Sequence, residues 1–295
     1  MPTAASNGIQ IYFETHGDPA NPALLLVNGF TAQILNWADG FREGLAARGF
    51  FVVSFDNRDV GLSTHLDGQT VDIPAVLAAS VGKGVMPPVP YTLSGFAADA
   101  VGLLDHLGIS KAHIAGSSMG GMIVQTIAIE HPDRVLTLTS IMSTSGEPGY
   151  FESTPEAGAA LMNPAPTERE ANIVASVERS RIISSPRYFD AEDARVRSAA
   201  SFDRAFYPEG IARQLAAIRS SGHRADGLRA LKLPTLVIHG RADPLITLKG
   251  GERTAELVPG ANLLVLHDMA HDLPRPLWPI IHDAMVSHMT HAISH

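Results

Sequence analysis

Short apolar runs alternate with segments of helical periodicity along most of this chain, and this alternation most constrains its fold. The runs lie at residues 9–15, 23–27, 50–55, 111–115, 134–141, 235–240 and 262–266. Several are almost entirely apolar, as expected for strands that are buried on both faces. Strands that alternate with helices pack into a mostly parallel sheet with helices on its faces. The sequence therefore predicts an α/β fold.

Helices are expected between these runs, where apolar residues recur every three to four positions. The predicted helices cover residues 37–48, 92–107, 119–131, 252–257 and 277–291. Phe41 and Leu45 lie four residues apart, and Gly49 ends the first of these segments. Thr92 is a suitable N-cap for the second segment, and Gly108 ends it.

The regular pattern stops after Ser143 and returns only near Gly227. Five prolines divide this stretch, at positions 155, 164, 166, 186 and 208, and predict short helices. We therefore expect one core, made of residues 1–144 and 228–295, that is interrupted by a helical lid over residues 145–227. Residues 70–90 are predicted to be a second, irregular insertion.

Composition excludes several classes of protein. Apolar residues make up 45% of the chain and charged residues 18%, as in a globular protein. The net charge is −8 without a basic cluster, which argues against nucleic acid or an anionic membrane surface as a partner. No secretion signal or apolar run of membrane-spanning length is visible. Whether copies of the chain form a homo-oligomer stays open.

The chain contains no cysteine, which excludes disulfides, a thiol nucleophile and thiolate metal sites. This absence also fits a cytoplasmic protein. Four histidines near the end, at positions 282, 288, 291 and 295, are too scattered for a metal site. We expect neither a metal nor a cofactor.

Residues 116–120 read Gly-Ser-Ser-Met-Gly, a G-x-S-x-G motif between a predicted strand and a predicted helix. A sharp turn at this place exposes the central serine, and a nearby histidine can then take its proton. Gly116 and Gly120 allow the close backbone approach that such a turn needs. The sequence therefore predicts that Ser118 is a nucleophile rather than an ordinary turn residue, with Ser117 as a packing neighbour.

A serine nucleophile of this kind needs an acid and then a histidine, in that order along the chain. Ligand sites in parallel sheets lie at the carboxyl ends of the strands. Asp243 follows one late strand, and His271 follows the last one. Asp243 can alternatively be a turn former before Pro244. His267 is the nearest rival of His271, but it lies too close to the end of its strand.

Other charged residues near strand ends are expected to have structural rather than catalytic roles. Asp56 and Arg58 are expected to form an ion pair that holds their loop. Asp268 and Asp272 are expected to be solvated loop carboxylates.

An acyl-transfer site also needs two backbone donors for the oxyanion. The N–H of Met119, which follows the nucleophile, is one candidate. The second is the N–H of Phe30, because Gly29 lets the chain turn after an early strand.

Six stretches together resemble the α/β-hydrolase superfamily over nearly the whole chain and, within it, aclacinomycin methylesterase-like bacterial carboxylesterases. They are residues 24–27, 56–63, 116–120, 234–238, 243–244 and 269–274. The resemblance implies an eight-stranded, mostly parallel sheet flanked by helices, with a helical lid. It also implies triad roles for Ser118, Asp243 and His271 and oxyanion donors at Phe30 and Met119. The chain has Asn28-Gly29 where many relatives have His-Gly.

A serine at the turn favours acyl transfer to water, because dehalogenases and epoxide hydrolases of this fold use aspartate there. We expect hydrolysis of a small to medium, apolar carboxylic ester through an acyl-enzyme. Carbon–carbon bond hydrolysis, lactonase and perhydrolase activity on the same triad remain alternatives, as does a non-catalytic ligand-binding role. Apolar lid residues are expected to pack on the core or to line the acyl pocket. They are Phe151, Leu161, Met162, Ile173, Val174, Ile182, Ile183, Phe189, Phe202 and Phe206.

Overall fold

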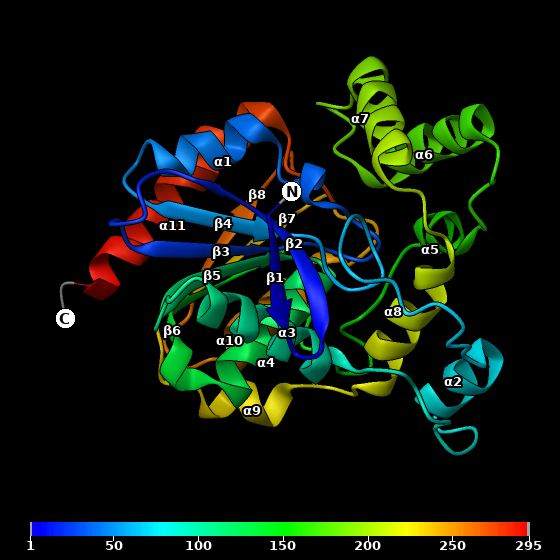
Figure 1. Cartoon of the computed structure of the whole chain (residues 1–295), viewed down its shortest axis with the longest axis horizontal. Coiled ribbons are helices and arrows are strands. Elements are labelled where there is room, and N and C mark those ends of the chain that lie inside the picture. The colour runs from blue at the N-terminus through cyan, green and yellow to red at the C-terminus, as the bar shows by residue number, and fades with distance from the viewer. Residues whose placement is uncertain (1, 294–295) are drawn as a thin grey trace.

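A single eight-stranded sheet forms the centre of the protein in the computed structural model, which describes residues 2–293 (Figure 1). The strands are β1 (Thr3–Ser6), β2 (Ile9–His16), β3 (Ala23–Val27), β4 (Phe51–Phe55), β5 (Ala112–Ser117), β6 (Val135–Ile141), β7 (Thr235–Gly240) and β8 (Asn262–Leu266). Their order across the sheet is β1-β2-β4-β3-β5-β6-β7-β8. Only β1 with β2 and β2 with β4 pair antiparallel, and all other pairs are parallel. The predicted fold class is confirmed.

Strand β1 has no counterpart among the seven runs that the sequence analysis singled out. It has four residues, of which Ala4 and Ser6 are buried. It pairs with β2 in an antiparallel hairpin at the edge of the sheet. Four residues are too few to show a periodicity, so only the pairing with β2 reveals this strand.

Side chains alternate between the two faces of the sheet, and helices cover both faces. Leu25 and Val27 of β3 belong to the apolar core on one side, and Leu24 and Leu26 belong to the core on the other side. The first side is covered by α3 (Leu93–His106), α4 (Met119–Glu130), α9 (Ala225–Ala230) and α10 (Leu248–Leu257). The second side is covered by α1 (Asp39–Ala46) and α11 (Trp278–Ile293).

The long stretch between β6 and β7, residues 142–234, is called the insertion below. Before α9 it contains α5 (Pro155–Met162), α6 (Arg169–Ile183), α7 (Ala191–Arg204) and α8 (Glu209–Ser220), which lie beside the end of the sheet in Figure 1. The prediction of only short helices is wrong, because α6 has 15 residues and α7 has 14. The prolines lie at the starts of helices or in the connections between them, where their missing N–H costs little. Pro155 begins α5, and Pro208 is the N-cap of α8.

The prediction that residues 70–90 are irregular is only partly right. Helix α2 (Ile73–Ser80) forms there, with Pro74 in its first turn. The side chain of its N-cap, Asp72, accepts a hydrogen bond of 3.0 Å from the N–H of Ala75. The helix packs against α8 of the insertion.

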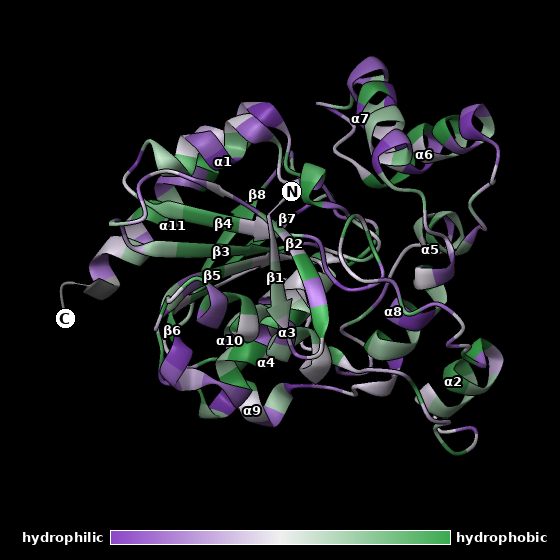
Figure 2. Ribbon diagram, viewed as in Figure 1, coloured by the Kyte–Doolittle hydropathy of each residue, from purple (hydrophilic) through white to green (hydrophobic). Residues whose placement is uncertain are grey.

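Hydropathy follows these layers in Figure 2, where β3 and β4 are mostly hydrophobic and much of α6 and α7 is hydrophilic. Among residues 2–293, no helix combines the length and the apolar character that crossing a membrane requires.

Candidate active site

Ser118 lies in the sharp turn that joins β5 to α4. Its backbone has φ 57° and ψ −120°, outside the regions that non-glycine residues prefer. Two hydrogen bonds fix this conformation. The N–H of Ser118 donates to the carbonyl of Ile141 at 2.9 Å, and the hydroxyl of Ser143 donates to the carbonyl of Ser118 at 2.8 Å. The neighbouring strand thus stabilises the strained turn.

The two glycines of the motif permit contacts between backbones. A Cβ on Gly116 would lie 2.1 Å from the carbonyl oxygen of Gly120. A Cβ on Gly120 would lie 2.1 Å from the carbonyl oxygen of Val27. Both distances are far below van der Waals contact, so only glycine fits at either position.

The turn brings Ser118 together with His271 and Asp243, as the strand-end argument predicts. Ser118 Oγ lies 3.0 Å from His271 Nε2, and His271 Nδ1 lies 2.8 Å from Asp243 Oδ2. The side chain of Asp243 is fully buried and that of His271 is 7% exposed. The rival His267 has an 83% exposed side chain and contacts Asp268 instead.

Backbone donors hold the Asp243 carboxylate. Its Oδ1 accepts hydrogen bonds of 2.9 Å from the N–H groups of Leu245 and Ile246. The carbonyl of Ile246 in turn lies 2.8 Å from Nε2 of the buried His239. Burial is the main cause that lowers the pKa of His239, so its imidazole is neutral near pH 7. His239 Nε2 also lies 3.5 Å from Asp243 Oδ2, farther than the 2.8 Å between His271 Nδ1 and the same oxygen.

The two predicted oxyanion donors border the same site. Met119 is the first residue of α4, so its N–H has no acceptor within the helix. The N–H of Phe30 makes no hydrogen bond with any residue that the structure describes. A Cβ on the preceding Gly29 would lie 3.2 Å from Cβ of Ser118, so this loop passes directly beside the serine.

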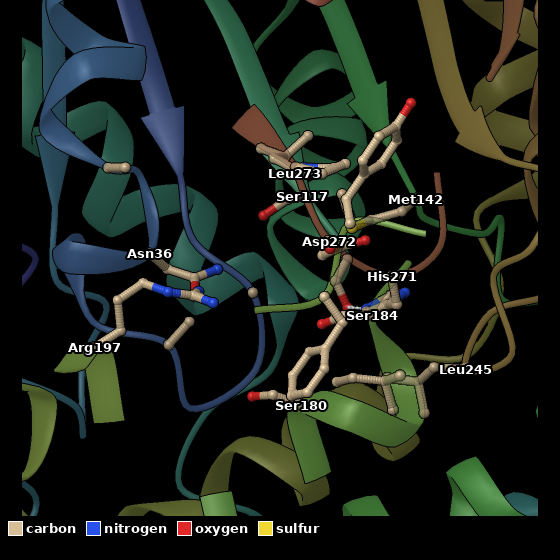
Figure 3. Close-up of a pocket in the computed structure, with 18 of the residues that line it drawn as sticks. Asn36, Ser117, Met142, Ser180, Ser184, Arg197, Leu245, His271, Asp272 and Leu273 are labelled. Carbon is tan, nitrogen blue, oxygen red and sulfur yellow. Dashed lines mark hydrogen bonds between the residues drawn. The ribbon is translucent and has the colours of Figure 1, made fainter. Parts of the chain in front are cut away.

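A cavity of about 640 Å³ opens above these residues, between the core and the insertion (Figure 3). Figure 3 shows Arg197 and Asn36 on one side of it and Ser184, His271 and Asp272 on the other. A smaller cavity of about 250 Å³ continues between α6, α7 and α8 and shares several lining residues with the first.

Several apolar residues of the insertion take one of the two roles expected for them, but Met162 and Val174 take neither. Leu161, Ile183 and Phe189 line the larger cavity, and Phe202 and Phe206 line the smaller one. Phe151 packs on the core, and Ile173 is buried. Met162 and Val174 are exposed.

The cavity is less apolar than expected, because charged side chains of α6 and α7 also line it. Arg197 pairs with Asp193 at 2.9 Å. Arg179 Nε donates to the carbonyl of Ala160 at 3.1 Å, and no carboxylate pairs with it among the described residues. Burial lowers the pKa of Arg179, which still leaves it charged near pH 7.

Asp272 lines the cavity as well and is half-buried, so it is less solvated than the expected loop carboxylate. It accepts a hydrogen bond of 3.0 Å from the N–H of Ser185, and burial raises its pKa. Asp268 does pair at the surface, 2.6 Å from Arg187.

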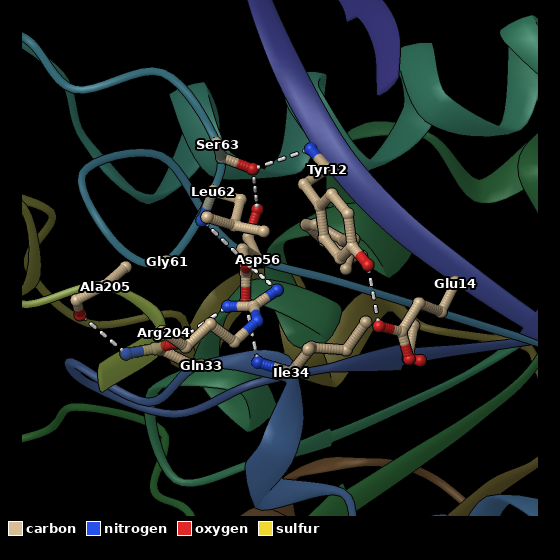
Figure 4. A network of polar contacts seen from close by, with 12 residues as sticks. Tyr12, Glu14, Gln33, Ile34, Asp56, Gly61, Leu62, Ser63, Arg204 and Ala205 are labelled. Atoms are coloured by element: carbon tan, nitrogen blue, oxygen red, sulfur yellow. Dashed lines mark hydrogen bonds and ion pairs between the residues drawn. The ribbon is translucent and has the colours of Figure 1, made fainter. Parts of the chain in front are cut away.

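The predicted ion pair between Asp56 and Arg58 does not form. Figure 4 shows Asp56 beside Arg204 of the insertion, 2.7 Å from its Nη2. The N–H groups of Ile34 and Leu62 also donate to Asp56, at 2.6 and 2.9 Å. Arg58 instead pairs with the buried Asp99 at 2.5 Å. Each residue finds its partner on another element, and spacing along the sequence cannot show such pairs.

Sequence reasoning also missed the polar side chains of α8. Arg213 and Gln214 are 4% and 1% exposed and reach the core loops after β3 and β4. Their only signal in the sequence is a polar pair within an otherwise apolar helix face.

Comparisons with known proteins agree with this architecture. A family model described as alpha/beta hydrolase fold matches residues 22–274. Rhodomycin D methylesterase DnrP of Streptomyces peucetius is 28% identical, and the match covers 98% of each chain. The 3-oxoadipate enol-lactonase 2 of Acinetobacter baylyi is 24% identical over 90% of this chain and 87% of its own.

Among solved structures, a meta-cleavage product hydrolase from Pseudomonas fluorescens superposes with a TM-score of 0.78. It is 18% identical, and the match covers 99% of this chain and 98% of the other. The predicted resemblance to methylesterases and the prediction of an esterase-type hydrolase are confirmed by the sequence matches. The chain belongs to the alpha/beta hydrolase fold family.

Proposed function

We propose that this hydrolase cleaves a carboxylic ester through an acyl-enzyme on Ser118. The observation that carries the proposal is the continuous contact from Ser118 Oγ through His271 to Asp243, at 3.0 and 2.8 Å. In the first step Ser118 Oγ attacks the carbonyl carbon, and His271 Nε2 takes the hydroxyl proton. Asp243 orients the imidazole and stabilises the imidazolium that forms.

The carbonyl oxygen becomes an oxyanion during this attack. The N–H groups of Phe30 and Met119 are proposed to bind it, since both lie beside Ser118 and neither has an acceptor within residues 2–293. His271 then gives its proton to the leaving alcohol. A water molecule, activated by the same imidazole, attacks the acyl-enzyme and releases the acid and Ser118.

The substrate is proposed to be a small to medium ester, because the cavity of about 640 Å³ holds a molecule of that size. Apolar side chains such as Leu161 and Phe189 offer contacts to its hydrocarbon part. Residues 145–227 are proposed to act as the lid over this cavity.

A second candidate is the hydrolysis of a lactone, which the enol-lactonase relative favours. The same attack by Ser118 opens a ring instead of releasing a separate alcohol. Comparing kcat/KM for a lactone and for its open-chain ester of equal size distinguishes the two reactions.

A fluorophosphonate probe tests the nucleophile. It is expected to label the wild-type protein and to leave Ser118→Ala unlabelled. Labelling that persists in Ser118→Ala would exclude this nucleophile, and a wild-type protein that resists labelling would favour a non-catalytic role.

Steady-state kinetics with p-nitrophenyl esters tests the histidine. His271→Ala is expected to lower kcat by about 10³-fold or more. The matched control is His267→Ala, since His267 is exposed and outside the site. Equal losses in both variants would contradict the assignment of His271.

A further inference from the structure

Thr31, next to the proposed oxyanion donor Phe30, has an unusual backbone conformation. Its φ is 59°, in the left-handed region that a β-branched residue rarely adopts. Such a conformation costs about 1–3 kcal/mol and persists only where surrounding contacts impose it. The contacts of this loop therefore decide where the N–H of Phe30 lies.

The contact that holds Thr31 comes from the insertion. The N–H of Thr31 donates to Oε1 of Gln214, on α8, at 2.9 Å. The other end of the same amide, Nε2 of Gln214, donates to the carbonyl of Arg58 at 2.9 Å. With only 1% of its surface exposed, Gln214 has both ends of its amide fixed by backbone groups of two core loops.

Helix α8 itself is docked closely on the core, so Gln214 has little freedom to move. A Cβ on Gly210 would lie 2.1 Å from the carbonyl oxygen of Asp59. Arg213 binds both carboxylate oxygens of Asp59 at 2.8 Å. Burial alone would raise the pKa of Asp59, but hydrogen bonds, the strongest from Arg213, lower it overall and keep the carboxylate ionised.

We infer that Gln214 is a positioning residue for the oxyanion site: it fixes the peptide after Phe30 so that the Phe30 N–H stays directed at the reacting oxygen. The inference depends on the proposed function, because it assigns Gln214 a role in that reaction. It also means that the insertion, besides covering the cavity, completes the geometry of the site.

The matched pair of variants is Gln214→Met and Gln125→Met. Methionine has nearly the volume of glutamine and lacks the amide. Gln125 is also buried and joins the insertion to the core, because Arg224 Nε donates to its Oε1 at 2.9 Å. Its side chain makes no hydrogen bond with Thr31 among the described residues. Gln125→Met therefore reports the cost of losing a buried contact to the insertion elsewhere.

Gln214→Met is expected to lower kcat about 10- to 100-fold, since loss of a whole oxyanion donor costs about 10²- to 10³-fold. KM for a p-nitrophenyl ester is expected to change less than about threefold, because the ground-state ester makes little use of the oxyanion donors. Gln125→Met is expected to retain kcat within about threefold of the wild type.

A trifluoromethyl ketone provides a readout that a purely structural role would not move. Ser118 Oγ adds to its carbonyl carbon, the hydroxyl proton passes to His271, and the oxygen becomes an oxyanion. The inhibition constant is expected to rise in Gln214→Met by the same factor by which kcat/KM falls. In Gln125→Met it is expected to stay near the wild-type value.

A wild-type kcat in folded Gln214→Met would overturn the inference, and so would equal losses in the two methionine variants. Fluorophosphonate labelling of Ser118 in the wild type separates these failures from a failure of the proposed function.

Discussion

At the scale of single residues, the site depends on backbones that approach more closely than side chains allow. Gly116 and Gly120 flank Ser118 in the sequence. A Cβ on either glycine would lie only 2.1 Å from a carbonyl oxygen and would collide with it. The strained φ of Ser118 and that of Thr31 are both held by hydrogen bonds from other elements. The positions of the proposed reacting groups are thus set by neighbouring backbone atoms.

Replacing Gly120 tests this dependence. Gly120→Ala is expected to destabilise the protein by about 3 kcal/mol, because the carbonyl of Val27 belongs to a central strand and cannot move away. Urea unfolding measures the change, and kcat is expected to fall with it. In the control Gly158→Ala, on α5, the new Cβ meets only the exposed Ser153 side chain. Stability within about 1 kcal/mol of the wild type is expected there.

At the scale of elements, the insertion is attached to the core by buried polar contacts rather than by an apolar face alone. Figure 4 shows Arg204, at the end of α7, between Asp56 and Gln33 of the core. Gln33 Nε2 also donates to the carbonyls of Ser201 and Ala205, at 2.7 and 2.8 Å. The loop after β3 is therefore held from both α7 and α8.

Removing the Arg204 side chain tests this attachment. Asp56 is fully buried, so Arg204→Met leaves its charge without the guanidinium partner. We expect a loss of about 3 kcal/mol in the free energy of unfolding, as for other broken buried pairs. Arg195→Met is the control on the same helix, because its pair with Glu170 is exposed and contributes about 0.5 kcal/mol. Similar losses in both variants would show that the buried pair has no special weight.

At the scale of the whole molecule, buried neutral histidines couple stability to pH. Burial is the main cause that lowers the pKa of His113 and of His282, to about 4 in each case. In the unfolded chain a histidine titrates near 6.5. Between pH 6.5 and 4 the unfolded state therefore binds more protons, and stability falls as the pH falls through this window.

His113→Gln tests this coupling. Each such histidine accounts for a loss on the order of 2 kcal/mol between pH 7 and pH 5. We expect the difference in unfolding free energy between these pH values to shrink by that amount in His113→Gln. Thr137→Val removes the hydroxyl 2.9 Å from His113 Nδ1 but keeps the titrating group. It is expected to lower stability at both pH values and to keep their difference. An unchanged difference in His113→Gln would contradict the prediction.

How much of this molecule the sequence predicts depends on how local each feature is. The strands, the turn at Ser118 and the placement of Asp243 and His271 follow from apolar runs and from the residues directly after them. The contact between Thr31 and Gln214 spans 183 positions, and that between Asp56 and Arg204 joins the end of β4 to the end of α7. Neither leaves a periodic signal, because both depend on how the insertion docks. Strand β1 and helix α2 were missed because short segments show little periodicity.

The insertion also forms a hydrogen bond with His271, the residue of the site that comes last along the chain. The carbonyl of Ile183, at the end of α6, accepts a hydrogen bond of 2.9 Å from the N–H of His271. During synthesis α6 leaves the ribosome well before His271 does. The hydrogen bond to the carbonyl of Ile183 therefore cannot form until His271 has emerged. Contacts between such distant segments form late and slow the folding of a chain. On the proposed mechanism, the nascent chain gains hydrolytic activity only after β8 and the loop that carries His271 have emerged.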